Sequence, residues 1–380
     1  MSKQRLLFSA SEVYPFAKSG GLADVAYSLP RALGTEYEVH VIMPLYKFVD
    51  RERFNIVSLD EHFDVMMGGV VYPVELFGCQ YEGLEYRFVY SPLLCDRDFL
   101  YGPPDSGYED NATRYGIFNY AMVALLKQEA YTVVHLNDWQ SALVPLLIKE
   151  DKTIQTKTVF TIHNLAYQGV FEPSVLKTLG IDERYFTMES MEFYGQVNFM
   201  KAGIAYADMI TTVSPSYAKE ILTSEFGCGL EGFLHYHRNK LTGIVNGIDI
   251  EHFSPSQDEA LIATYVDLRG KAVNKRAYLK EIALKDAKKP LFIFVGRFAS
   301  QKGLDLLIEA LPKIVALECN IAILGEGEGK YHDALKAIAC KHHNIHLTFG
   351  YDEDLSHRMY AAADFFLMPS LFEPCGLAQM

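Results

Sequence analysis

Short apolar runs rich in β-branched and aromatic residues recur along this chain, and many are followed by a turn and then a helical pattern. This alternation is typical of α/β folds with mostly parallel sheets. It predicts strands at Arg5–Ser9, Glu38–Met43, Val133–Leu136, Thr158–Ile162, Met209–Val213, Leu241–Val245, Leu291–Val295, Asn320–Leu324, His346–Phe349 and Phe365–Met368. We therefore expect an α/β protein built on doubly wound, Rossmann-like sheets.

The pattern starts twice, which indicates two domains. The first strand begins at residue 5, and a second start at Leu291 follows a charged helical stretch over Arg269–Lys289. The turn-forming residues Asn246–Asp249 lie between them, so we expect domains at 1–245 and 246–380. Two such domains are expected to face each other across a cleft, and ligands bind beyond the carboxyl ends of the strands. Within Phe63–Tyr90, alternating runs predict an antiparallel hairpin inserted in the first domain.

The net charge and the absence of targeting signals indicate which partners and which cellular location to expect. The net charge is −13 and no run of basic residues occurs, which argues against duplex nucleic acid and anionic membranes as partners. The six cysteines form no Cys-x-x-Cys pair. We see no signal peptide, and no apolar run approaches the roughly 20 residues of a membrane helix. These features predict a soluble cytoplasmic protein.

Three loops in the first domain carry candidate ligand-binding groups. The first strand is followed by Lys18-Ser19-Gly20-Gly21-Leu22-Ala23-Asp24, where a helix starting near Leu22 can present free N–H groups to an anion beside Lys18. The next two candidates, Asp138 and Asn164, follow later strands and can hydrogen-bond sugar hydroxyls. Trp139 fits the core better than a ligand contact, and a lone His163 is more often structural than catalytic.

In the second domain, candidate ligand-binding residues again follow predicted strands. Arg297 and Lys302 follow the strand Leu291–Val295 and precede a helix that begins near Leu304, a position that suits a diphosphate. Pro374 fits the first turn of a helix, so Gly376 and Leu377 could offer N–H groups, with Glu373 at the strand end. The alternatives are two solvated surface cations and a glutamate at a helix N-cap.

These loops, together with several others, resemble the successive signatures of the bacterial glycogen synthase and starch synthase family, in the family's order from end to end. The matching segments are Lys18–Leu22, Asn137–Trp139, His163–Gly169, Asn198–Gly203, Tyr206–Asp208, Val213–Pro215, Asn246–Asp249, Arg297 with Gln301–Gly303, and Phe372–Leu377. The resemblance implies a GT-B glycosyltransferase. Two departures stand out: Asn137 replaces the family's usual histidine, and the chain stops at Met380 where family members continue.

The resemblance also implies a role for each site residue. Arg297, Lys302, Lys18 and Gly21 would bind the nucleotide diphosphate, with Asp24 supporting the Lys18 loop. The sugar or the acceptor would be held by Asp138, Asn164, Asn246 and Glu373, with His163 against the anomeric carbon through its backbone carbonyl. Tyr351 would stack on the adenine. The last set, Cys375, Gly376 and Leu377, would face the nucleotide-sugar.

The implied reaction is retaining transfer of glucose from ADP-glucose to the non-reducing 4-hydroxyl of an α-1,4-glucan. Arg297, Lys302 and the helix N-termini would stabilise the leaving diphosphate, so neither a metal nor a cofactor is expected. UDP-glucose remains open as the donor. The alternatives are another retaining GT-B glycosyltransferase with a different acceptor, and a non-catalytic glucan-binding protein or inactive fragment. With its second domain incomplete at Met380, the 380-residue chain alone is expected to be weakly active or inactive.

Overall fold

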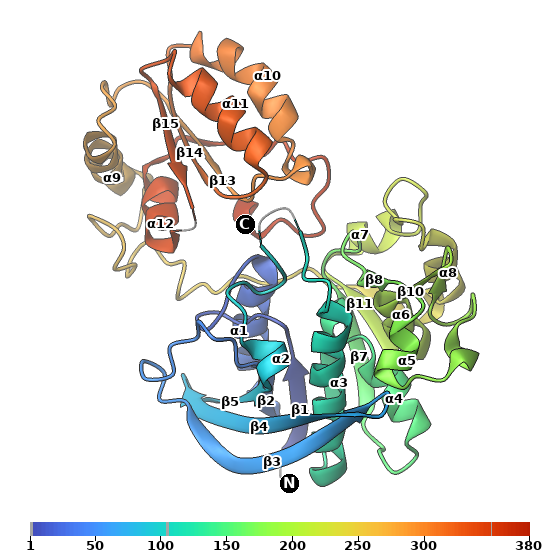
Figure 1. The fold of residues 1–380 in the computed structure, drawn as a ribbon. Helices are drawn as coiled ribbons and strands as arrows, with labels where there is room; N and C mark the ends of the chain where they lie inside the picture. Colours follow the sequence, from blue (N-terminus) through green and yellow to red (C-terminus); the bar gives the residue numbers. More distant parts are fainter. Residues whose placement is uncertain (1–2, 104–105, 351) are drawn as a thin grey trace. The chain divides into compact units, whose positions relative to one another are not determined.

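The computed structural model describes residues 3–103, 106–350 and 352–380. The chain forms two compact units, Met1–Gly247 (unit 1) and Ile248–Met380 (unit 2). Both units are α/β, as the strand pattern predicts, and Figure 1 shows the elements of each. Within the described ranges, no helix combines the length and the apolar character needed to cross a membrane.

Unit 1 is built on a sheet of nine strands among the residues described, in the order β12-β11-β7-β6-β1-β2-β5-β4-β3. The strands are β1 (Gln4–Ser9), β2 (Tyr37–Pro44), β3 (Val57–Met67), β4 (Val70–Tyr81), β5 (Leu84–Tyr90), β6 (Val133–Asn137), β7 (Lys157–Ile162), β11 (Met209–Thr212) and β12 (Leu241–Gly243). From β12 to β5 all neighbours pair in parallel, whereas β4 pairs antiparallel with both β5 and β3. Strand order reverses on either side of β1, next to β6.

The antiparallel part of unit 1 is larger than the sequence predicts. The predicted hairpin corresponds to β4 and β5, but β3 adds a third strand, and β5 joins the parallel part through β2. A separate small sheet also forms, with β10 (Gln196–Asn198) between β8 (Val170–Phe171) and β9 (Glu192–Phe193). Its strands are too short for a sequence pattern to reveal.

Helices cover the sheet of unit 1 and connect its strands. They are α1 (Gly21–Leu33), α2 (Pro92–Cys95), α3 (Asn111–Gln128), α4 (Val144–Glu150), α5 (Val175–Leu179), α6 (Phe199–Tyr206), α7 (Pro215–Glu220) and α8 (Glu231–Tyr236), with short 3-10 turns η1 (Trp139–Ser141), η2 (Glu183–Tyr185) and η3 (Arg238–Lys240). The longest, α3, contacts β3, α4 and α5, and most of its side chains are buried.

Unit 2 contains a smaller, fully parallel sheet in the order β15-β14-β13-β16. Its strands are β13 (Leu291–Val295), β14 (Asn320–Gly325), β15 (Ile345–Phe349) and β16 (Phe365–Phe366). The last is shorter than the predicted Phe365–Met368. Strand order reverses between β13 and β16, so the loops after these two strands leave from the switch point, where open α/β sheets bind ligands.

Two apolar cores, one on each face of the sheet, hold unit 2 together. The helices α10 (Leu304–Val315) and α11 (Gly329–Ala339) pack over one face, and α9 (Leu268–Glu281) and α12 (Glu353–Ala362) over the other (Figure 1). Alternate strand residues supply the two cores: Phe294 and Ile323 belong to the first, Ile293 and Leu324 to the second. This is the doubly wound arrangement that the sequence predicts.

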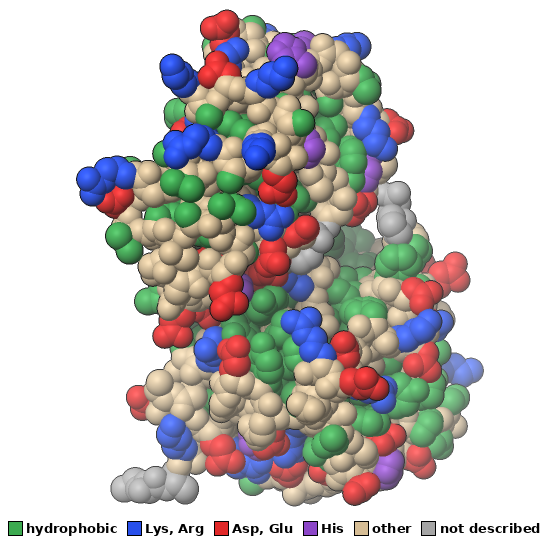
Figure 2. Space-filling view, turned by 90° about the vertical axis from the view of Figure 1, so that its left-hand side faces the viewer, with side chains coloured by type: hydrophobic (Ala, Val, Ile, Leu, Met, Phe, Trp, Pro, Cys, Tyr) green, Lys and Arg blue, Asp and Glu red, His purple; other side chains and the backbone are tan. Residues whose placement is uncertain are grey.

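Lysine, arginine, aspartate and glutamate side chains are interspersed on the face of the molecule that Figure 2 presents. Hydrophobic side chains lie between them, as on most protein surfaces.

Candidate active site

In unit 1 the candidate residues gather at the carboxyl ends of three neighbouring strands. Parallel pairing aligns the end of β1 with β6, and the end of β6 with β7. Asn137, at the end of β6, donates from Nδ2 to the backbone oxygen of Ser9 on β1, at 2.8 Å. The loops after these strands therefore start from one edge of the sheet, next to the point where strand order reverses.

The loop after β1 presents Lys18 beside the start of α1. Lys18 Nζ lies 2.7 Å from Asp24 Oδ1, a pairing that fits the supporting role expected of Asp24. Gly21 is the first residue of α1, and Gly20 before it has no side chain with which to cap the helix. Lys18 and Ser19 also line a hollow of about 350 Å³ with Phe48, Phe99 and Tyr101.

A buried carboxylate that the sequence reasoning missed holds this loop in place. Glu12 is 2% exposed, and its Oε2 accepts hydrogen bonds from the Ser19 N–H, at 2.6 Å, and from the Ser19 hydroxyl, at 2.5 Å. An acidic residue three positions after an apolar strand is the sequence signal that could have identified it. Loss of Glu12 would leave the Lys18 loop without this anchor.

Asp138 occupies a strained backbone position and links two loops. Its φ is +55°, in the region that favours glycine, at a cost of about 1–3 kcal/mol. Its Oδ1 accepts a hydrogen bond from the His163 N–H at 2.8 Å. Burial raises the pKa of Asp138 to about 7, and the backbone N–H groups of His163 and Asn164 oppose that rise. The side chain is thus poised to exchange a proton near neutral pH.

We predict that Asp138 makes folding pH-dependent. In an unfolded chain an aspartate titrates near about 4, so between about pH 4 and 7 the folded protein holds a proton that the unfolded chain has lost. Its contribution to stability therefore falls as the pH rises through this window. In denaturant titrations, the free energy of unfolding of the wild type, measured relative to that of Asp138→Asn, should therefore decrease from pH 5 to pH 8. A wild-type-to-variant difference that is the same at both pH values would contradict this.

The imidazole of His163 is engaged by Asn137. His163 Nε2 donates to Asn137 Oδ1 at 2.8 Å, since an amide oxygen can only accept. Burial, with a smaller effect from His135, lowers the pKa of His163 to about 3, so the ring is neutral at physiological pH. This hydrogen bond from His163 to Asn137 fixes the position of the imidazole, and no sequence pattern indicates it.

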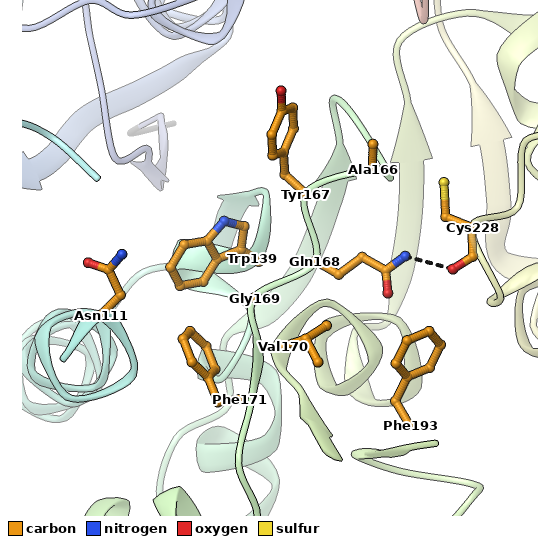
Figure 3. A pocket seen from close by; sticks show the side chains of 10 residues that line it. All are labelled: Asn111, Trp139, Ala166, Tyr167, Gln168, Gly169, Val170, Phe171, Phe193 and Cys228. Carbon is orange, nitrogen blue, oxygen red and sulfur yellow. Dashed lines mark hydrogen bonds between the residues drawn. The ribbon is translucent and has the colours of Figure 1, made fainter. Parts of the chain in front are cut away.

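Asn164 lies two residues before Ala166. Ala166 is one of the residues that line a pocket of about 480 Å³ in unit 1 (Figure 3). Asn164 Oδ1 accepts a hydrogen bond from the Ala166 N–H at 3.0 Å. The pocket is lined by Asn111, Trp139, Ala166, Tyr167, Gln168, Gly169, Val170, Phe171, Phe193 and Cys228. Trp139 is 8% exposed and packs edge-on against Tyr115, so it belongs to the core as predicted while also reaching this pocket.

A glycine shapes the wall of this pocket. Gly169 has φ +64°, and a Cβ there would lie 2.5 Å from the indole of Trp139. Any other residue would be strained and would displace Trp139. Gln168 Nε2 donates to the Cys228 backbone oxygen at 3.0 Å, which ties the turn to the segment before α8 (Figure 3).

In unit 2 the loops after β13 and β16 meet through a charged pair. Lys302 Nζ lies 2.5 Å from Glu373 Oε1, and both side chains are largely buried. Lys302 ends the 3-10 turn η4 (Ser300–Lys302), and Arg297, which precedes this turn, is exposed. This juxtaposition places a cation and a carboxylate together at the switch point of the sheet.

Backbone contacts hold the two loops of unit 2 together. Gly303 has φ +67°, and a Cβ there would lie 2.0 Å from the Pro369 oxygen, so only glycine permits this approach. The Leu371 N–H donates to the Gln301 oxygen at 2.9 Å, and Gln301 Nε2 donates to the Phe372 oxygen at 3.3 Å. Gly303 also precedes α10, whose first turn therefore lacks a side-chain cap.

The helix predicted to begin at Pro374 does not form, so that prediction was wrong. Gly376 adopts φ +81°, which is incompatible with a right-handed helix through this segment. Only a 3-10 turn, η5 (Leu377–Gln379), follows it. Cys375, Gly376 and Leu377 are all partly exposed. Their N–H groups therefore belong to a loop and a 3-10 turn, without an α-helical N-terminus.

Two candidates remain, Asn246 and Tyr351. Asn246 is a partly exposed residue near the end of unit 1, two residues before the start of unit 2. Tyr351 lies outside the described residues, so its predicted stacking role stays a prediction.

Most of unit 1 matches a known protein family. Residues 5–236 match the family described as "Starch synthase catalytic domain". The chain belongs to the starch synthase family. Residues 275–380 of this starch synthase family member also match the family "Glycosyl transferases group 1", so the protein is a glycosyltransferase.

Relatives of this starch synthase family member include bacterial enzymes and a plant enzyme. It is 42% identical to the glycogen synthase of Syntrophotalea carbinolica and 44% identical to that of Aquifex aeolicus, covering 99% of this chain and 80% of each relative. It resembles the catalytic domain of starch synthase IV from Arabidopsis thaliana, solved with ADP and acarbose bound. That TM-score is 0.93 at 33% identity, over 100% of this chain and 80% of the other. The predicted GT-B glycosyltransferase fold and the predicted family are thereby confirmed.

Proposed function

We propose that this glycogen or starch synthase transfers glucose from ADP-glucose to the non-reducing 4-hydroxyl of an α-1,4-glucan, with retention of configuration at C1. The observation that carries the proposal is the Lys302–Glu373 pair at 2.5 Å, at the switch point of the unit 2 sheet in a chain of the starch synthase family. The presence of ADP and acarbose in the Arabidopsis relative supports an adenine nucleotide donor.

The reaction requires that the departing nucleoside diphosphate be stabilised electrostatically. Negative charge grows on the leaving oxygen, and we assign its stabilisation to Arg297, Lys302, Lys18 and the N–H groups that begin α1 at Gly21. Each preorganised donor of this kind lowers the activation barrier by about 3–4 kcal/mol. Lys302 would exchange part of its bond to Glu373 for the phosphate oxygens.

Positive charge grows at C1 as the diphosphate leaves. We assign its stabilisation to the backbone carbonyl of His163, because the neutral imidazole is occupied with Asn137. Asp138 holds the His163 backbone in place through its N–H and, together with Asn164, contacts sugar hydroxyls. Glu373 holds the donor glucose, and Asn246 contacts the acceptor side.

The test compares donors and acceptors directly. Purified protein, in the longest reading frame that contains this sequence, is given ADP-glucose or UDP-glucose with glycogen, maltoheptaose or an unrelated acceptor. We expect transfer to both glucans, with a higher kcat/KM for ADP-glucose. Preference for UDP-glucose would refute the donor assignment, and transfer only to the unrelated acceptor would refute the glucan assignment.

We predict that chelator changes transfer activity by less than about twofold. The charge that develops on the leaving group is assigned to Arg297, Lys302 and Lys18, so the chemical step needs no divalent ion. The measurement is initial rate before and after treatment with EDTA. Activity that disappears and returns with magnesium or manganese would contradict the assignment of these cations.

A further inference from the structure

A cluster of metal-ligating side chains in unit 2 has no role in the reaction proposed above. One ligand atom from each of His252, Glu353 and His357 lies within 4.8 Å of the other two. His252 Nε2 is 3.4 Å from Glu353 Oε1, and the rings of His252 and His357 are 5.3 Å apart. Ligands of a tetrahedral zinc ion lie about 3.3 Å apart, so small side-chain rotations would bring all three onto one ion.

The backbone positions these ligands well for a shared ion. Glu353 and His357 are four residues apart in α12 and therefore lie on the same face of that helix. Asp352 caps α12 by accepting a hydrogen bond from the Leu355 N–H at 2.8 Å, so the turn that carries Glu353 is well defined. His252 comes from a separate turn, in which Asp249 Oδ1 accepts its N–H at 3.0 Å.

His357 supplies a second observation that points to a ligand. Its side chain is 6% exposed, and its Nδ1 lies 2.8 Å from Asp258 Oδ2. Its Nε2 is buried and has no hydrogen-bond partner among the described residues. A carboxylate that accepts the Nδ1 proton leaves Nε2 with a lone pair, the arrangement of zinc-binding histidines.

The surroundings complete such a site. Asp258 is itself held, because its Oδ1 accepts the Ala260 N–H at 2.9 Å. The ring of Phe253 packs 5.0 Å from that of His357 and 4.8 Å from that of His252, which gives the cluster an apolar wall. Two imidazoles and one carboxylate suit zinc, whereas magnesium prefers six oxygen ligands.

We propose that His252, Glu353 and His357 bind one divalent ion of the zinc type, with a water molecule as the fourth ligand and Asp258 orienting His357. The bound ion ties the segment that opens unit 2 to the start of α12. Its role is structural, so the proposal is independent of the transfer reaction and of the chelator test at assay temperature.

The test is zinc binding to the purified protein after removal of metals. The wild type should bind one zinc ion tightly, magnesium should not compete, and zinc should raise the melting temperature. Glu353→Gln and His357→Ala should lose this binding, and Asp258→Asn should weaken it by about 10–100-fold. The control His343→Ala changes an exposed histidine of the same unit and should bind zinc like the wild type.

Two readouts keep the outcome decisive if a variant folds poorly. Glu353→Gln preserves side-chain size, and circular dichroism reports whether it folds. Cobalt in the wild type should give the visible bands of a four-coordinate nitrogen and oxygen site, without a thiolate charge-transfer band. No tight zinc binding, a thiolate band, or equal binding by a folded Glu353→Gln protein would overturn the proposal.

Discussion

Replacing Lys302 with alanine should lower kcat for glucose transfer by about 10²–10³-fold, because a preorganised positive charge at the leaving diphosphate is lost. Arg297→Ala should have an effect of the same order. The Lys302 side chain is held at 2.5 Å from Glu373, so the charge is already in place before the leaving group departs. The measurement is steady-state transfer from ADP-glucose to glycogen.

The matched control for this prediction is Lys313→Ala. Lys313 lies in the last turn of α10, is exposed, and belongs to the helix that follows the Lys302 loop. It should retain wild-type kinetics, and thermal unfolding should show that all three variants remain folded. If folded Lys302→Ala and Arg297→Ala proteins turn over within a few-fold of the wild type, these cations do not act on the leaving group.

Glu373→Gln should reduce kcat/KM by about 10²-fold or more. Glutamine keeps the size of the side chain but removes the charge that pairs with Lys302 and that we assign to the donor glucose. Residues that share a hydrogen bond couple in double-mutant cycles. The Lys302→Ala/Glu373→Gln double variant should therefore lose less than the product of the single losses and remain worse than either single variant.

The cycle separates two roles for Glu373. If Glu373 acts only by positioning Lys302, the double variant will be no worse than Lys302→Ala alone. If it also holds the sugar, the double variant loses further activity. A Glu373→Gln protein with wild-type kcat/KM would exclude both roles.

The sequence predicts the parallel strands well because they are buried on both faces. Runs such as Leu291–Val295 and Asn320–Gly325 are almost continuously apolar, and short apolar runs of this kind are typical of strands covered on both faces by helices. The strand β3 was missed because much of its surface is exposed and its sequence is rich in charge. In the last segment, the local signal of Pro374 was overridden by the left-handed conformation of Gly376.

In the candidate site, too, the sequence predicts some residues and misses others. The loops that hold Lys18, Asp138, His163, Arg297 and Lys302 follow predicted strands, so the rule that ligands bind at carboxyl ends finds them. The groups that support them are not local. Glu12 acts on Ser19 across a loop, and Asn137 joins Ser9, 128 positions away, to His163. Contacts of this kind depend on the tertiary fold, and a single sequence does not reveal them.

Glucan extension is tested most directly by the product that the purified protein, in the longest reading frame that contains this sequence, forms from labelled ADP-glucose and maltoheptaose. We predict that maltoheptaose is extended by one glucose at a time at its non-reducing end, in an α-1,4 linkage that an exo-acting α-1,4-glucosidase removes. Release of free glucose without extension, or a product that this glucosidase leaves intact, would contradict this prediction.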